Sequence, residues 1–218
     1  MPRLLFEKTG SAIYISHLDL MRLFQRAFKR AGLPLTHTQG FNPRPSVSIA
    51  LPLSVGVESS CELLDFDLYG DKIPNDEILD RLNRALVAGV RVLDVYDNGS
   101  KIKNLSCLDC VLTLEYDDGV PENARNHISA LFAQPEVIVQ KKSKNGIKEE
   151  NIIPMIRSLA IKEADKELEL YARICCQNPT LNPMQLPAAI EKYLPACKAD
   201  FVRCRRVEIF DANNQIFR

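Results

Sequence analysis

The chain has 218 residues, which is enough for one large domain or two small ones with a buried core. Its apolar fraction of 46% and charged fraction of 26% are ordinary for a globular protein. The sequence contains no run of eighteen apolar residues, so no membrane span is expected. The first ten residues lack the long apolar region of a signal peptide, so we expect a cytoplasmic protein with reduced cysteines.

Positive and negative charges are unevenly distributed, although the net charge is zero. Residues 1–45 contain seven Lys or Arg and two acidic residues, whereas residues 58–98 contain four basic and ten acidic residues. The local field, rather than the total charge, decides whether an anion is attracted. The N-terminal part of the chain can therefore bind an anionic partner.

The first half of the chain predicts the element order β-α-β-β-α-β. Alternating apolar residues indicate strands, and apolar residues at spacings of three and four indicate helices. The expected elements are a strand at 3–8, a short extended piece at 12–15, a helix that follows the N-cap Ser16, strands at 46–51 and 61–69, a helix capped by Asn75, and a strand at 90–96. This order is that of a ferredoxin-like domain, which we place at residues 1–98.

The second half, residues 104–218, repeats this order less regularly. The expected elements are strands at 105–116, 136–141, 168–175 and 201–210, helices at 122–132 and 182–194, and a polar hairpin or loop at 141–150. The apolar residues from Ile152 to Ile161 fit neither period, so this piece stays unassigned. The predicted fold class is α+β, with two tandem ferredoxin-like (βαββαβ) units of which the second is less regular.

The helix after Ser16 carries four basic residues at spacings of three and four, so they share one face. They are Arg22, Arg26, Lys29 and Arg30. Two interpretations stand: a solvated helix face, and a surface that contacts successive phosphates. The scarcity of acids among residues 1–45 favours the second, and Lys8 on the preceding strand joins the expected phosphate contacts.

The loop after this helix contains the words QGF and NPRP. Gly40 permits backbone geometry that other residues resist, and the two prolines hold the segment extended. Phe41, Asn42 and Arg44 would then present a stacking ring, an amide and a cation, which are groups that recognise single-stranded RNA. The alternative is a rigid connection with Phe41 buried in the core.

His17 and His37 are candidates for acid–base chemistry. His17 is expected at the first helical position, where the helix dipole disfavours protonation, and the alternative is a residue that completes the capping hydrogen bonds. His37 lies in a polar loop, where simple exposure is the alternative. No metal site is expected, because the C-x-x-C of Cys107 and Cys110 falls on a predicted strand and an offset of three separates the thiols.

Several motifs at residues 4–59 resemble those of a bacterial family. They are Phe6-Glu7-Lys8-Thr9-Gly10, Ser16-His17-Leu18-Asp19-Leu20, Arg22, Arg30-Ala31-Gly32-Leu33-Pro34, Gly40-Phe41-Asn42-Pro43-Arg44-Pro45 and residues 51–59. In these motifs the chain resembles the radical-SAM-linked protein family, a domain of unknown function. Its members are encoded beside, or fused to, a radical SAM protein.

The resemblance implies a radical SAM protein as partner. That partner would hold the iron–sulfur cluster and S-adenosylmethionine, with no cofactor in this chain. Such genes can lie near RNA-processing and ribosomal genes, which is compatible with an RNA substrate. The family often has histidine at the position of Arg44, so the resemblance implies no shared catalytic role there, whereas a phosphate or base contact survives the exchange.

The main hypothesis is a non-catalytic RNA-binding accessory module that presents a tRNA or rRNA segment to the radical SAM partner. Lys8, Arg22, Arg26, Lys29, Arg30 and Arg44 would contact phosphate, and His17, Phe41 and Asn42 would read or stack on bases. One alternative is a metal-independent endoribonuclease with His17 or His37 in acid–base roles, since the predicted fold resembles that of CRISPR repeat-processing enzymes. The other is a purely protein-binding adaptor.

Overall fold

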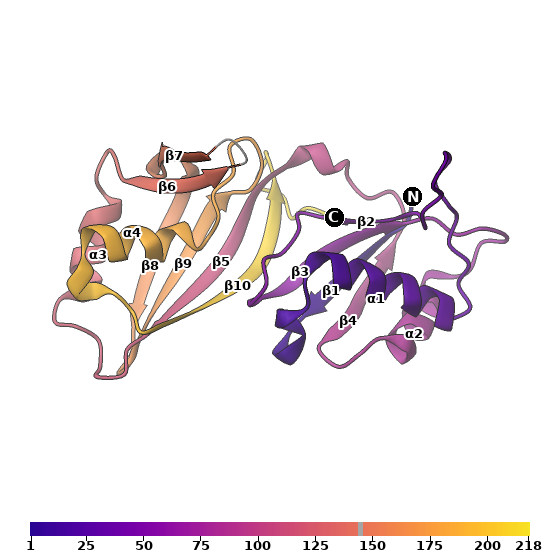
Figure 1. The fold of residues 1–218 in the computed structure, drawn as a ribbon, viewed down its shortest axis with the longest axis horizontal. Helices are drawn as coiled ribbons and strands as arrows, with labels where there is room; N and C mark the ends of the chain where they lie inside the picture. Colours follow the sequence, from indigo (N-terminus) through magenta and orange to yellow (C-terminus); the bar gives the residue numbers. More distant parts are fainter. Residues whose placement is uncertain (144–145) are drawn as a thin grey trace. The chain divides into compact units, whose positions relative to one another are not determined.

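The computed structural model describes residues 1–143 and 146–218, and the chain divides into two compact units. The first unit consists of Met1–Asn104 together with Ile216–Arg218, and the second of Leu105–Gln215. The last three residues, expected in the second domain, therefore belong to the first unit. Both units combine helices with strands, in agreement with the predicted α+β class (Figure 1).

The first unit has the expected element order. Its elements are β1 (Arg3–Lys8), α1 (His17–Arg30), β2 (Val47–Ala50), β3 (Val57–Phe66), α2 (Asn75–Ala85) and β4 (Val90–Tyr96). The strands lie in the order β4-β1-β3-β2, and every neighbouring pair is antiparallel. A short 3-10 helix, η1 (Gly10–Tyr14), replaces the extended piece expected at 12–15.

Aromatic contacts fix α1 on this sheet. Phe24 and Phe28 of α1 are fully buried. The Phe24 ring lies 4.8 Å from the ring of Phe6 on β1, and the Phe28 ring lies 5.1 Å from that of Phe66 on β3. Such pairs contribute about 0.5–1.5 kcal/mol beyond the burial of their area. The basic face of α1 therefore points away from the core.

The second unit contains one sheet of four strands and a separate hairpin. Its elements are β5 (Leu105–Glu115), α3 (Ala124–Phe132), β6 (Ile138–Ser143), β7 (Gly146–Asn151), η3 (Ile153–Met155), β8 (Ile156–Glu163), β9 (Glu167–Cys175), α4 (Gln185–Tyr193) and β10 (Phe201–Asp211). The sheet order is β10-β5-β9-β8, all antiparallel. Strands β6 and β7 pair with each other at the expected polar hairpin, of which residues 144–145 lie outside the described residues.

One local expectation needs correction, and the structure defines the segment that the sequence left without an assignment. The segment left unassigned is η3 followed by β8, whose pairing with β9 is interrupted by a bulge between Ile156 and Ser158. A bulge shifts the alternation of inward and outward side chains, which explains why neither period fitted. Asn75 does not cap α2, because the N-cap position is Pro74 and no side-chain cap is formed.

The C-terminal residues pack against the beginning of the first unit. Phe217 is 1% exposed, and its ring lies 5.5 Å from the guanidinium carbon of Arg3. The backbone N–H of Ser100 donates to the carbonyl of Arg218 at 2.6 Å. Among the described helices, none combines the length and the apolar character needed to cross a bilayer.

Candidate functional site

Helix α1 begins at a side-chain cap, as the sequence predicts. The Oγ of Ser16 accepts a hydrogen bond from the Asp19 N–H at 3.2 Å and donates one to the Asp19 carboxylate at 2.7 Å. The hydrogen bonds from Ser16 and Arg22 lower the pKa of Asp19. A carboxylate in the first turn also suits the helix dipole, so the start of α1 is well defined.

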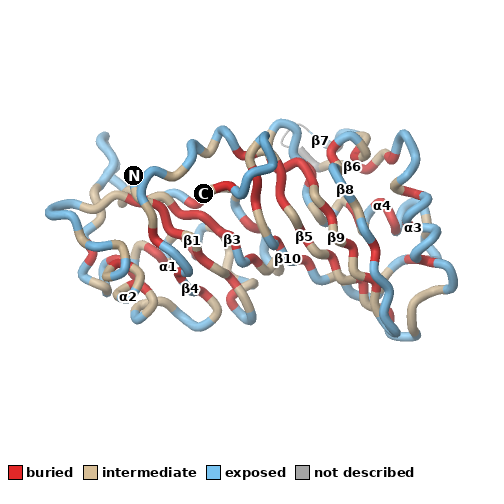
Figure 2. The backbone as a smooth tube through the Cα atoms, turned by 180° about the vertical axis from the view of Figure 1, so that it is seen from behind, coloured by how far each residue is buried: buried red, intermediate tan, exposed pale blue. Residues whose placement is uncertain are grey.

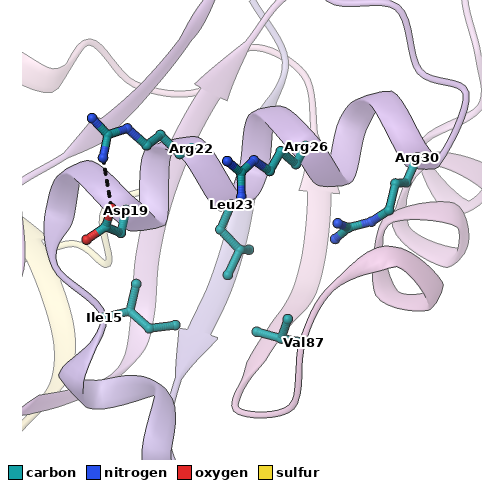
Figure 3. Close-up of a pocket in the computed structure, with 7 residues that line it drawn as sticks. All are labelled: Ile15, Asp19, Arg22, Leu23, Arg26, Arg30 and Val87. Carbon is teal, nitrogen blue, oxygen red and sulfur yellow. Dashed lines mark hydrogen bonds and ion pairs between the residues drawn. The ribbon is translucent and has the colours of Figure 1, made fainter.

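A shallow groove of about 390 Å³ runs beside α1 (Figure 3). Its lining combines an apolar part, Ile15, Leu23 and Val87, with a charged rim, Asp19, Arg22, Arg26 and Arg30. Figure 3 shows the three arginines along one side of the helix, while Leu23 points from α1 toward Val87. Residues four apart on a helix lie about 5–6 Å from each other, so the rim is a row of cations.

The three arginines of the rim differ in their partners. Arg22 pairs with Asp19 at 3.0 Å, and both side chains are more than half exposed. Arg30 donates from Nη2 to the carbonyl of Ala85 at 2.5 Å, which joins the end of α1 to the end of α2. Arg26 makes no hydrogen bond or ion pair with any described residue. Arg26 is therefore the arginine most available to an anionic ligand.

The two lysines expected on this surface lie elsewhere. Lys29 is exposed near the end of α1 but does not line the groove. Lys8 is 1% exposed, and its Nζ donates to the carbonyls of Ile13 at 3.0 Å and Ile15 at 2.8 Å. Burial lowers its pKa, and the charge of Glu62 opposes this shift. The expected phosphate contact of Lys8 is wrong, because its ammonium instead holds two carbonyls at the end of η1.

The loop between α1 and β2 is closed at its base and exposed at its tip. The Thr38 N–H donates to the Arg44 carbonyl at 2.8 Å, and the Arg44 N–H donates to Thr38 Oγ1 at 3.1 Å. Phe41 is 100% exposed, so the alternative of a buried ring is wrong. Asn42 and Arg44 are exposed as well. The loop contributes no residue to the groove lining, so the two are separate features of the first unit.

The two candidate histidines lie at opposite ends of the segment that runs from the start of α1 to the base of the following loop. His17 is the first residue of α1, and its Nδ1 is buried without a hydrogen-bond partner among the described residues. His37 is exposed and lies opposite Pro45 at the base of the loop. The described residues give neither imidazole an acid or base partner.

The cysteines of the C-x-x-C lie in the core of the second unit. Cys107 and Cys110 are both buried, and Cys110 Sγ donates to the carbonyl of Ala172 at 3.6 Å. Burial raises the pKa of the Cys110 thiol. Within residues 1–143 and 146–218, no group of three His, Cys, Asp or Glu side chains could hold a metal ion.

Sequence reasoning missed the apolar part of the groove. Ile15 and Val87 lie outside the helix, and Val87 comes from the turn between α2 and β4. The one signal in the sequence is an apolar residue, Val87, between a predicted helix and a predicted strand, and the structure leaves its side chain 45% exposed. Its proximity to α1 is a tertiary contact that no local pattern encodes.

Residues 2–183 match the family described as an uncharacterized protein conserved in bacteria (DUF2344). The chain belongs to this family. The match covers the motifs at residues 4–59 from which a bacterial family was expected. A search of curated proteins found no match.

Two solved structures show what the fold is similar to. A chain in the crystal structure of a Cbf5-Nop10-Gar1 complex matches 95% of this chain and 48% of its own length, with a TM-score of 0.51 and 9% identity. A chain in the crystal structure of the archaeal box H/ACA sRNP Nop10-Cbf5 complex matches 94% of this chain and 46% of its own length, with a TM-score of 0.46 and 10% identity. This chain thus spans about half the length of these matches, and the first likeness shows a shared fold alone.

Proposed function

We propose that the protein is a cytoplasmic, non-catalytic RNA-binding module that presents a tRNA or rRNA segment to a radical SAM enzyme. The partner would carry the iron–sulfur cluster and S-adenosylmethionine. The observation that carries the RNA part is the groove beside α1, with its apolar lining and its rim of arginines. The proposal of a radical SAM partner rests on the resemblance of the motifs at residues 4–59 to those of the radical-SAM-linked family.

The chemistry of the groove fits a nucleotide chain. A row of cations one helical turn apart follows the repeated charges of a phosphate backbone. Leu23 and Val87 offer an apolar surface for a ribose or an unpaired base, which a site built for inorganic anions would not need. Since Arg26 has no partner among the described residues, binding a phosphate there breaks no existing ion pair.

The closed loop would add contacts to bases. Phe41 exposes its whole ring, and burying such a ring against an unpaired base removes apolar surface from water. Asn42 and Arg44 stand beside it with an amide and a cation, and His17 lies at the start of α1. These four residues, with Arg22, Arg26, Lys29 and Arg30, make up the proposed RNA-binding set, from which Lys8 is removed.

We also propose that both units are ferredoxin-like. The first has the strand order β4-β1-β3-β2, and the second has β10-β5-β9-β8, which is the same order when the β6–β7 hairpin is treated as an insertion. The split βαβ arrangement supports this reading. The likeness to a chain of the Cbf5-Nop10-Gar1 complex concerns the fold and assigns no substrate.

Binding of a fluorescein-labelled, single-stranded 20-nucleotide RNA, followed by anisotropy over a series of salt concentrations, tests the RNA part. Removal of two phosphate contacts by Arg22→Ala with Arg26→Ala should lower the affinity and reduce the salt slope by about 1.4, at 0.7 per contact. The matched control is Arg84→Ala with Arg91→Ala, which removes two exposed charges from the same unit outside the groove.

Equal effects of the two double variants would contradict the proposed groove, because only the net charge would then matter. Cleavage of the RNA by the purified protein would favour the endoribonuclease alternative, and His17→Ala and His37→Ala variants would then identify the acid–base group. Ribonuclease treatment before purification tests the protein partner separately from the RNA, since the radical SAM protein should still co-purify with this protein.

A further inference from the structure

The second unit has an open sheet face that the proposed function does not use. Alternate side chains of β5 and β9 are buried, among them Leu112 and Leu170, and they point to the face covered by α3 and α4. Figure 2 shows the four strands from the opposite side, where no helix of this unit lies in front of them. Side chains on this side are only partly buried.

The pairing register places four side chains in one row across this face. Val111 of β5 lies opposite Arg205 of β10 on one side and opposite Tyr171 of β9 on the other, and Tyr171 lies opposite Ala160 of β8. Val111 and Ala160 are short, whereas Tyr171 and Arg205 are long. The difference leaves a groove of about 350 Å³, which these four residues line together with Ser158 and Arg173.

The long side chains of the groove are held in different ways. Arg173 forms two hydrogen bonds to the carboxylate of Asp109, at 2.7 and 2.8 Å, and is therefore not available to a ligand. The hydroxyl of Tyr171 donates to Glu169 at 2.5 Å, which fixes the ring. Arg205 is exposed and has no ion-pair partner among the described residues.

We propose that this groove is a second RNA site, which binds one unpaired base against Tyr171 and the adjoining phosphate at Arg205. The proposal rests on the proposed RNA function and extends it to the second unit. The ammonium of Lys162 lies 4.6 Å from the Tyr171 ring centroid, so the base stacks on the other ring face. A ring on the open face of a four-stranded sheet is a known mode of single-strand recognition.

The aromatic ring of Tyr171 and the exposed guanidinium of Arg205, in one row of the sheet, favour a nucleotide over an apolar peptide as the occupant. Three acidic side chains of this face are paired with arginines, Asp109 with Arg173 and both Glu115 and Glu167 with Arg203, while Glu169 accepts the hydrogen bond of Tyr171. Of the two arginines that line the groove, Arg205 is the one that no carboxylate of the described residues pairs with, so it is available to a phosphate. The short side chains of Val111 and Ala160 form the floor of the groove.

The test measures binding of the same 20-nucleotide RNA, with 4-thiouridine for crosslinking, to four further variants. Tyr171→Ala should weaken binding about 5- to 150-fold, the range for loss of a base–aromatic stack, and Tyr171→Phe should retain most of the affinity. Arg205→Ala should weaken binding too, whereas Thr113→Ala, on the same face but outside the groove, should not. Crosslinks should map to the β9 peptide that contains Tyr171.

The outcomes separate the two proposals. Weakening by the α1 double variant alone would leave the proposed function standing and overturn the second site. Weakening by Tyr171→Ala and Arg205→Ala, with no effect of the α1 double variant, would support the second site and overturn the groove beside α1. An equal loss for Tyr171→Phe and Tyr171→Ala would also overturn the stack, since the phenylalanine keeps the ring. Urea unfolding of each variant shows whether a lost affinity reflects lost folding, and absence of β9 crosslinks in the wild type overturns the second site independently.

Discussion

Each unit joins its two central strands by an arginine–aspartate pair that is capped by a phenylalanine. In the first unit, Arg3 of β1 binds Asp65 of β3 at 2.5 and 3.1 Å, and the ring of Phe217 lies 5.5 Å away. In the second, Arg173 of β9 binds Asp109 of β5 at 2.7 and 2.8 Å, with Phe210 at 3.9 Å.

The two pairs share their geometry and differ in burial. The side chains of Arg3 and Asp65 are 5% and 21% exposed, whereas those of Arg173 and Asp109 are 28% and 33% exposed. Burial alone would lower the pKa of Arg3, but the hydrogen bond and the charge of Asp65 outweigh it and raise the pKa. The same contact is therefore mostly buried in one unit and accessible to solvent in the other, so loss of one partner should cost more in the first.

Replacement of each arginine by methionine should give the largest contrast between the units. Arg3→Met leaves Asp65 without its partner in a mostly buried place and should lower the free energy of unfolding by about 3–5 kcal/mol. Arg173→Met should lower it by about 1 kcal/mol, because water reaches the remaining carboxylate. Urea unfolding of both variants measures the difference, and equal losses would show that burial does not separate the pairs.

The thiols offer a second contrast, at alkaline pH. Six of the seven cysteines lie in the second unit, and all seven are buried. Burial raises the pKa of Cys176 to about 12 and that of Cys204 to about 11, and it also raises the pKa of Cys110. Below about pH 8 these thiols are protonated in both states and contribute no pH dependence.

Above about pH 8 the thiols ionise in the unfolded chain and stay protonated in the folded one, so stability should fall as the pH rises. At pH 10 the loss should be about 4–6 kcal/mol for the three thiols together. Urea unfolding at pH 8, 9 and 10 measures it. The triple variant Cys110→Ala, Cys176→Ala, Cys204→Ala should show a flatter pH dependence than the wild type. An unchanged slope in this variant would assign the alkaline effect to other groups.

Two glycines test how closely each unit packs its turns. Gly89 and Gly119 have positive φ angles of 83° and 93°. A Cβ at Gly89 would collide with the Thr9 carbonyl and lie 2.8 Å from Ala12 Cβ, whereas at Gly119 its nearest neighbour is the Asp165 carbonyl at 3.9 Å. Gly119→Ala should cost about 1–2 kcal/mol from the backbone alone, and Gly89→Ala about 1–3 kcal/mol more. Thermal unfolding compares them, and equal shifts in Tm would mean that Thr9 moves freely.

Local patterns predicted α1 well, because its cap and its apolar spacing act within a few residues. Ser16 caps the helix as expected, and Phe24 lies on its buried face. Lys8 was misplaced because its burial depends on carbonyls of η1, a 3-10 helix that the sequence did not reveal. Val87 was missed because it meets α1 only in the folded unit.

The C-terminal segment has a consequence for the order in which the chain can fold. Phe217 completes the surroundings of the Arg3 and Asp65 pair, although the whole of the second unit separates it from them in sequence. During synthesis the first unit must therefore wait for more than a hundred later residues before this part of its core closes. Until then the Arg3 guanidinium lacks its contact with the Phe217 ring. The first unit is synthesised before the second, but its packing is completed after it.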